Sequence, residues 1–231
     1  SNFRVVSMKY WLVALLIYSL PLQALQLGDA APDFEAETTM GAVHLDHWRK
    51  DHWVVLFSHP ASFTPVCTTE LAAVERLQGA FEKRNVRPLA LAVSPLGDLK
   101  KWLDDIEESQ GVRPSFPVIS DQSRNISTRY GMMHPRSNNV TTVRSVFIID
   151  PRGRIRLKID YPPSIGRNFD EILRAIDALQ TSYRYPVLTP ADWQPGDNAI
   201  ISPKLSDGDS KALFPDQEEA ILPYLKYTPL P

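Results

Sequence analysis

Short apolar runs alternate with polar segments from residue 54 onward, and their length and composition are typical of buried strands. The first run, residues 54–57 (Val-Val-Leu-Phe), ends before Pro60 and Pro65, and proline stops strand pairing. Four further runs are predicted to be strands: residues 87–93, 116–120, 144–150 and 155–160, the last two joined by a turn at 151–153.

Between these runs the apolar residues recur every three or four positions, which is the period of a helix. One such pattern begins at Thr68 and places Leu71, Val74, Leu77 and Phe81 on one face. The same spacing predicts helices at residues 98–109, 126–130 and 169–179, while residues 41–45 are predicted to form a hairpin and strand. Strands that alternate with helices, followed by two adjacent strands and a last helix, indicate an α/β fold with a sheet of mixed direction.

The N-terminal stretch, residues 1–24, differs from the rest of the chain. Arg4 and Lys9 precede an apolar run at 10–20, followed by Pro21 and small or polar residues. This layout is typical of a secretory signal peptide, and the run is shorter than the roughly 20 residues of a membrane span. We expect a secreted, endomembrane or periplasmic protein if this segment is cleaved. The alternative is an anchored or merely disordered extension, with a cytoplasmic protein as the default.

The main domain is predicted to cover residues 27–182, and a C-terminal segment covers residues 183–231. The segment is rich in turns and proline, which favours an extended rather than a helical tail. It also contains Trp193, Ile200 and Phe214, and is too apolar for a freely solvated tail. We therefore expect that these residues, together with Ile201, need a surface to cover them.

Composition narrows the classes of function. The chain has 231 residues, 43% of them hydrophobic and 23% charged, as in ordinary globular proteins. A net charge of −2, with scattered Lys and Arg, gives no reason to expect nucleic acid binding. A single cysteine excludes an intramolecular disulfide framework and any Cys-x-x-Cys redox or zinc site. His44, His47 and His52 lack an accompanying ligand framework, so no metal site is predicted.

That single cysteine, Cys67, lies between the strand predicted at residues 54–57 and the helical pattern that begins at Thr68. The first turn of a helix offers unpaired N–H groups and the positive end of the helix dipole, and both stabilise a thiolate. Thr64 lies three residues earlier, so its hydroxyl could reach the sulfur or the molecule that the sulfur attacks. The alternative is a buried cysteine that acts as a small hydrophobic residue.

The string Pro60-Ala-Ser-Phe-Thr64-Pro-Val-Cys67 resembles the Pro-x-x-x-Thr-x-x-Cys signature of the peroxiredoxins. The longer string from His59 through Cys67-Thr-Thr-Glu-Leu resembles their one-cysteine class, and the resemblance covers residues 27–226. One departure is Ser62, where that class usually has Asp. The resemblance implies a thioredoxin-like peroxiredoxin fold whose C-terminal segment reaches across to a second subunit as a dimer arm.

The resemblance also assigns roles to residues outside the signature. Arg144 matches an arginine that pairs with the catalytic cysteine and holds the peroxide, although a solvated strand end is the ordinary reading of such a residue. Glu70, one helical turn after Cys67, would hold that guanidinium in place. Arg167 matches a second arginine near the pocket, or is simply a charge ahead of a helix. His59 would form a wall of the pocket, or is a hydrogen-bonded core histidine.

The resemblance predicts a thiol-dependent peroxidase without a cofactor, in which Cys67 reduces hydroperoxides with Thr64, Arg144 and Pro60 around it. The resulting sulfenic acid needs an external thiol, glutathione or a thioredoxin-like protein, because the chain has no second cysteine. The alternative is a thioredoxin-like chaperone or interaction module without turnover. Some relatives of this class use a serine to hydrolyse phospholipids, but His52 occupies that position here, which excludes that nucleophile.

Overall fold

The computed structural model describes residues 24–134, 136 and 140–231 of the chain. The leader expected at residues 1–24 therefore lies, except for its last residue, outside the described part. Within the described ranges, no helix is long and apolar enough to cross a membrane.

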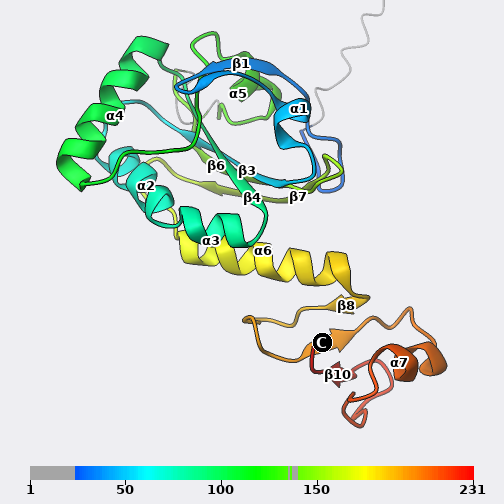
Figure 1. Ribbon diagram of the computed structural model, residues 1–231. Helices are drawn as coiled ribbons and strands as arrows, with labels where there is room; N and C mark the ends of the chain where they lie inside the picture. Colours follow the sequence, from blue (N-terminus) through cyan, green and yellow to red (C-terminus); the bar gives the residue numbers. More distant parts are fainter. Residues whose placement is uncertain (1–23, 135, 137–139) are drawn as a thin grey trace, which may run out of the picture.

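The main domain is built on one seven-stranded sheet of mixed direction, as the sequence predicts (Figure 1). Three neighbouring strands in its middle, β3, β4 and β5, run parallel to one another, and the other pairs are antiparallel. Across the sheet, the order is β2 (Gly41–His44), β1 (Glu35–Thr38), β5 (Val118–Ser120), β4 (Val86–Ala92), β3 (Trp53–His59), β6 (Arg144–Ile149) and β7 (Ile155–Tyr161).

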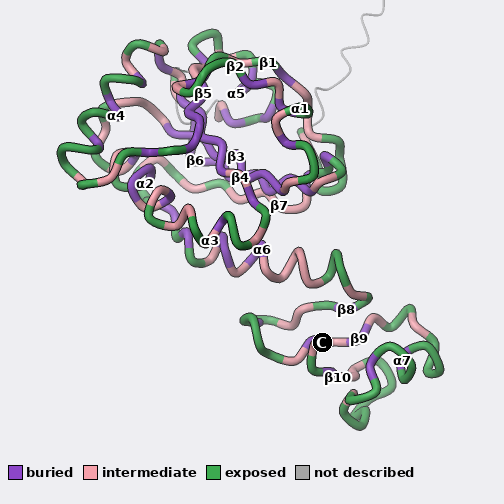
Figure 2. Tube along the Cα trace, in the orientation of Figure 1, coloured by how far each residue is buried: buried purple, intermediate pink, exposed green. Residues whose placement is uncertain are grey.

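Helices cover both faces of this sheet, so its central strands are buried on both sides (Figure 2). Alternate residues of β3 enter different cores: Val55 and Phe57 face one, and Val54 and Leu56 face the other. The first core is covered by α2 (Pro65–Arg76), α3 (Gln78–Lys83), α4 (Leu96–Gln110) and α6 (Phe169–Arg184), and the second by α1 (Leu45–Arg49) and α5 (Asn125–Arg129).

The five strand runs and four helical patterns all correspond to observed elements, with shifted bounds. The pattern from Thr68 to Phe81 is divided between α2 and α3, because the backbone leaves the helical conformation at Leu77 (φ −100°, ψ 5°). The helix predicted at 169–179 continues to Arg184. Strand β1 has the polar sequence Glu-Ala-Glu-Thr, which carries no strand signal, and it forms by pairing with β2 and β5.

The C-terminal segment folds into a small unit of its own beyond α6 (Figure 1). Its three strands pair antiparallel in the order β10-β9-β8, and Val187, Ala199, Ile201 and Phe214 form a separate core. The elements are β8 (Val187–Leu188), β9 (Ala199–Ile201), α7 (Asp207–Leu213) and β10 (Tyr227–Thr228).

The packing of this unit bears on the predicted dimer arm. The expectation that Trp193, Ile201 and Phe214 need a partner surface is wrong, because all three are already buried within the single chain. Ile200 is half-buried. The side chains left uncovered are others, including Ile221 and Tyr224, which are 84% and 68% exposed.

Candidate active site

Cys67 is the third residue of α2, in its first turn, as predicted. The helix begins here because Pro65 occupies its first position, where the missing N–H is not needed, and Thr64 has the extended backbone of an N-cap residue. The Cys67 side chain is completely buried in the core between α2 and the sheet. The sulfur therefore lies at the positive end of the helix and away from bulk water.

Arg144 brings a positive charge to this sulfur: its Nη1 lies 3.2 Å from Cys67 Sγ. The guanidinium cannot swing away easily, because Nε and Nη2 donate to the carbonyl of Pro163 at 3.0 and 2.7 Å. Ser58 fixes the backbone on both sides of Arg144: its hydroxyl donates to the Val143 carbonyl at 2.6 Å and accepts from the Ser145 N–H at 3.0 Å. The structure thus excludes the reading of Arg144 as a solvated strand end.

Glu70 is the carboxylate that holds two arginines, and it lies one turn after Cys67 on α2. It accepts from Arg144 Nη1 at 2.9 Å and from Arg167 Nη2 at 2.7 Å, Nε at 2.9 Å and backbone N–H at 2.8 Å. Burial raises the pKa of Glu70, but the hydrogen bonds and charge of Arg167 outweigh burial and set this pKa at about 2. The carboxylate therefore stays ionised at neutral pH.

Arg167 is itself completely enclosed, so it is not merely a charge ahead of a helix. Its Nη1 donates to the Ser145 carbonyl at 2.9 Å. The next residue, Asn168, caps α6 by accepting from the N–H groups of Asp170 and Glu171, which fixes the backbone beside Arg167. Burial lowers the pKa of Arg167, while the bonds to Glu70 raise it.

The buried charges of Glu70 and the two arginines do not sum to zero. Glu70 supplies one negative charge against the positive charges of Arg144 and Arg167, and all three side chains are buried. An uncompensated buried charge is costly, so this group favours an additional anion within reach. The Cys67 sulfur, in contact with Arg144, is a group within reach that can carry such a charge.

His59, the last residue of β3, is also completely buried, and its Nε2 lies 3.5 Å from Glu70 Oε2. Burial and the nearby charges of Arg167 and Arg144 lower the pKa of His59 to about 3, although Glu70 opposes the shift. The ring is therefore neutral and packs edge-on against Phe57 and Trp102. His59 thus lies beside Glu70 in the buried cluster around Cys67, and its role as a pocket wall stays a prediction.

Pro60 and Thr64 lie in the loop between β3 and α2, and both are half-buried. The Thr64 hydroxyl donates to the Ala61 carbonyl at 2.9 Å rather than to the sulfur. Between them, Phe63 adopts a left-handed conformation (φ 55°) that is uncommon for a bulky residue. Sequence reasoning missed this turn, and it missed the Pro163 carbonyl, because neither has a residue-type signal.

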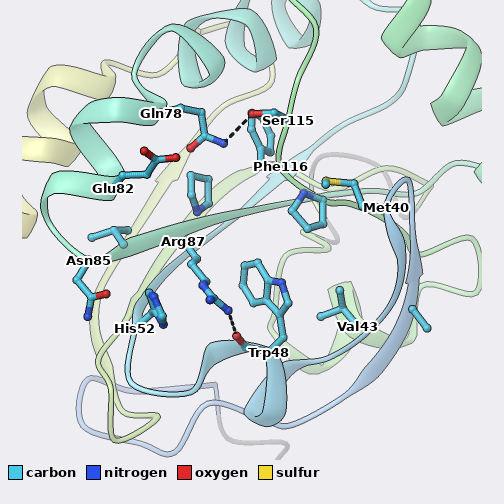
Figure 3. A pocket seen from close by; sticks show the side chains of 14 residues that line it. Met40, Val43, Trp48, His52, Gln78, Glu82, Asn85, Arg87, Ser115 and Phe116 are labelled. Carbon is cyan, nitrogen blue, oxygen red and sulfur yellow. Dashed lines mark hydrogen bonds between the residues drawn. The ribbon is translucent and has the colours of Figure 1, made fainter.

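A separate cavity of about 510 Å³ lies at the opposite end of the parallel strands (Figure 3). His52 and Trp48 line it, and Arg87 Nη1 donates to the Trp48 carbonyl there. The histidines do not gather in it: His44 pairs with Asp33, and the His52 ring contacts the Arg49 carbonyl. No group of three or more metal-ligating side chains occurs among the residues that the structure describes.

Comparison with known proteins gives matches over most of the chain. The AhpC/TSA family matches residues 27–158, and the C-terminal domain of 1-Cys peroxiredoxin matches residues 178–220. A 1-Cys peroxiredoxin of Dictyostelium discoideum is 46% identical over 90% of this chain and 86% of its own length. Peroxiredoxin-6 of Gallus gallus is 42% identical over 91% of this chain and its own full length.

Two solved structures have a fold similar to that of this chain. A crystal structure of the peroxiredoxin 6 of Arenicola marina has a TM-score of 0.85 and 43% identity, and covers 90% of this chain and 99% of its own. A structure described as the basis of thiol resolving in a yeast mitochondrial 1-Cys peroxiredoxin, via glutathione/thioredoxin systems, has a TM-score of 0.84 and 44% identity, and covers 89% and 100%.

The neutral His59 predicts how stability responds to acid. Below its ordinary pKa of 6.5, the unfolded chain binds a proton at His59, whereas the folded chain does so only near pH 3. The free energy of unfolding should fall as the pH drops below 6.5, by up to about 1.4 kcal/mol per pH unit from this residue. In His59→Leu, urea unfolding between about pH 6.5 and pH 5 should show a shallower fall. An equally steep fall in both proteins would show that His59 is not held neutral.

Proposed function

This chain belongs to the AhpC/TSA family and is a one-cysteine peroxiredoxin, a thiol-dependent peroxidase; we propose that Cys67 is the residue that reduces the peroxide. The observation that carries the assignment is the contact of 3.2 Å between Arg144 Nη1 and Cys67 Sγ. It joins the single cysteine of the chain to a cation whose position is fixed by four hydrogen bonds, to Cys67, Glu70 and Pro163.

In the proposed reaction, the Cys67 thiolate attacks the terminal oxygen of a hydroperoxide. The S–O bond forms as the O–O bond breaks, and the departing alkoxide or hydroxide takes up a proton to leave as alcohol or water. The Arg144 guanidinium stabilises the negative charge as it moves from sulfur to the departing oxygen, and Thr64 orients the peroxide. The product on the enzyme is the Cys67 sulfenic acid.

The surrounding residues act through these groups. Glu70 and Arg167 hold the Arg144 guanidinium at the sulfur, and His59 forms an uncharged wall beside them. Pro60 follows the end of β3, where it limits the access of bulk water to the loop before α2. No cofactor is needed, because the two electrons come from the cysteine itself.

Regeneration needs an external reductant. The chain contains one cysteine, so the sulfenic acid cannot be resolved by a disulfide within the chain. A first thiol displaces water to form a mixed disulfide, and a second thiol releases Cys67 and carries away the new disulfide. Glutathione and thioredoxin systems are the reductants named for the similar yeast protein, and we propose the same classes here.

The number of peroxide equivalents consumed per chain tests the one-cysteine mechanism. Without added thiol, one equivalent of peroxide should be consumed per chain, with no disulfide-linked dimer on a non-reducing gel, because each sulfur is enclosed in its own pocket. Excess peroxide should then add two oxygen atoms to the Cys67 peptide in mass spectrometry. Cys67→Ser serves as the control and should consume none. A quantitative disulfide between subunits would show that the one-cysteine mechanism is wrong.

We further propose that the chain forms a homodimer through its C-terminal unit, residues 183–231. The support is a set of exposed apolar side chains on one small unit: Leu188, Leu213, Ile221, Leu222 and Tyr224. Large exposed apolar surfaces mark interaction sites, and the pairing of identical surfaces is the commonest form of such an interface.

The dimer can be tested without deleting the unit. Ile221→Ser combined with Tyr224→Ser removes the two most exposed side chains of the set but none of the small core. In sedimentation at micromolar concentration, the full chain should be a dimer and the double variant should shift toward monomer. Leu27→Ser, also at an exposed apolar residue but in the main domain, should remain a dimer. A full-length chain that sediments as a monomer would remove the proposal.

We propose that residues 1–24 direct export of the protein and are then removed, with the cytoplasm as the default location if they are retained. The intact mass of the protein from its native host tests this, since a species that begins before Tyr10 contradicts cleavage.

A further inference from the structure

Three serines lie in a row where the parallel strands end, and none of them is one of the fixed residues of the peroxiredoxin signature. Ser62 follows β3, Ser94 follows β4, and Ser120 is the last residue of β5. The Ser94 hydroxyl oxygen accepts from the Ser62 N–H at 3.3 Å and from the Ser62 hydroxyl at 2.9 Å. The Ser120 hydroxyl, at the end of the neighbouring strand β5, donates to the Ser94 carbonyl at 2.7 Å. Ser94 is buried, so it is a fixed point for the loop that carries Ser62.

The peptide group between Ala61 and Ser62 links this fixed point to Thr64. A peptide group is planar, and in the trans form its N–H and C=O point in opposite directions. The N–H end of this peptide donates to Ser94, and the C=O end accepts the Thr64 hydroxyl at 2.9 Å. A rotation of the peptide plane would break both bonds together. Ser94 therefore influences the direction of the Thr64 hydroxyl without touching it.

The loop needs this support because its next residue is strained. Phe63 has a φ of 55° and a side chain that is 48% exposed, so little packing holds it in the left-handed region. Such a conformation is unfavourable for a bulky residue and persists only where surrounding contacts impose it. The bonds to Ser94 lie immediately before Phe63, and helix α2 begins directly after Thr64.

We propose that Ser94 is a positioning residue for the peroxidase reaction. Through the Ala61–Ser62 peptide, Ser94 orients the Thr64 hydroxyl so that its oxygen accepts a hydrogen bond from the peroxide. With its proton committed to the Ala61 carbonyl, the Thr64 oxygen presents lone pairs to the O–H of the bound peroxide. Arg144, which can only donate, then serves the peroxide oxygens. The proposal rests on the proposed function of Cys67 and Thr64.

The test compares two reactions of the same sulfur. In Ser94→Ala, the second-order rate of Cys67 oxidation by hydrogen peroxide, followed by stopped flow, should fall about 10-fold, as expected for one lost positioning bond. Alkylation of Cys67 by iodoacetamide does not use Thr64, so its rate should change less than about twofold. Ser94→Thr keeps the hydroxyl and should restore the peroxide rate.

A matched variant and a double-mutant cycle make the test specific. Ser62→Ala keeps the backbone N–H bond to Ser94 and loses only the hydroxyl bond, so the peroxide rate should stay near that of the parent. In a Thr64→Val background, Ser94→Ala should cause no further loss, because the two residues act through one bond. If Ser94→Ala does not fold, Ser120→Ala, which frees the Ser94 carbonyl, should lower the peroxide rate in the same selective way.

Two results would overturn the proposal. An equal loss of the peroxide and alkylation rates in Ser94→Ala would show a general structural role, and independent effects of Ser94→Ala and Thr64→Val would show that no relay connects them. Both results leave the assignment of Cys67 intact. If Cys67→Ser consumed peroxide at the parent rate, the proposed function itself would fail, whatever Ser94 does.

Discussion

One buried carboxylate, Glu70, holds this site together. It accepts hydrogen bonds from two buried arginines and thereby joins three elements: α2, which carries Cys67; β6, which begins at Arg144; and the segment before α6, which carries Arg167. Removing one partner of a buried ion pair typically costs about 3–5 kcal/mol, because the remaining charge is left unpaired. Here two cations depend on the same anion. The position of Arg144 at the sulfur is therefore a property of the whole fold rather than of a local loop.

The sulfur benefits from an imbalance that this arrangement creates. A second buried carboxylate would pair the remaining guanidinium charge and leave nothing for Cys67 to compensate. Instead, the neutral ring of His59 occupies the space beside Glu70 and adds no charge. The start of α2 adds its unpaired N–H groups on the same side. Burial disfavours a thiolate and a neighbouring positive charge favours one, and Arg144 places that charge in contact with the sulfur.

Local sequence patterns predicted the elements that carry Cys67 and Glu70. The strand before Cys67, the helix after it and the one-turn spacing to Glu70 are short-range features, and periodicity is sufficient to find them. The places of Arg144 and Arg167 beside Cys67 were predicted only through resemblance, since the side chains they contact there, Cys67 and Glu70, lie more than seventy residues away in sequence. Contacts made by backbone groups, such as the Pro163 carbonyl and the Ala61–Ser62 peptide, have no residue-type signal at all. The C-terminal sheet was missed because its strands are only two or three residues long.

The proposed reaction needs a thiolate on Cys67, and the structure places Arg144, held by Glu70, in contact with that sulfur. The ultraviolet absorbance of the thiolate at neutral pH, measured against Cys67→Ser as the blank, tests this most directly. The account predicts a full thiolate band in the parent chain and its loss in Arg144→Gln, while Arg156→Gln, at a more exposed arginine of β7, keeps the band. A band of the same size in Arg144→Gln as in the parent would contradict the account, because the thiolate would then owe nothing to the arginine in contact with it.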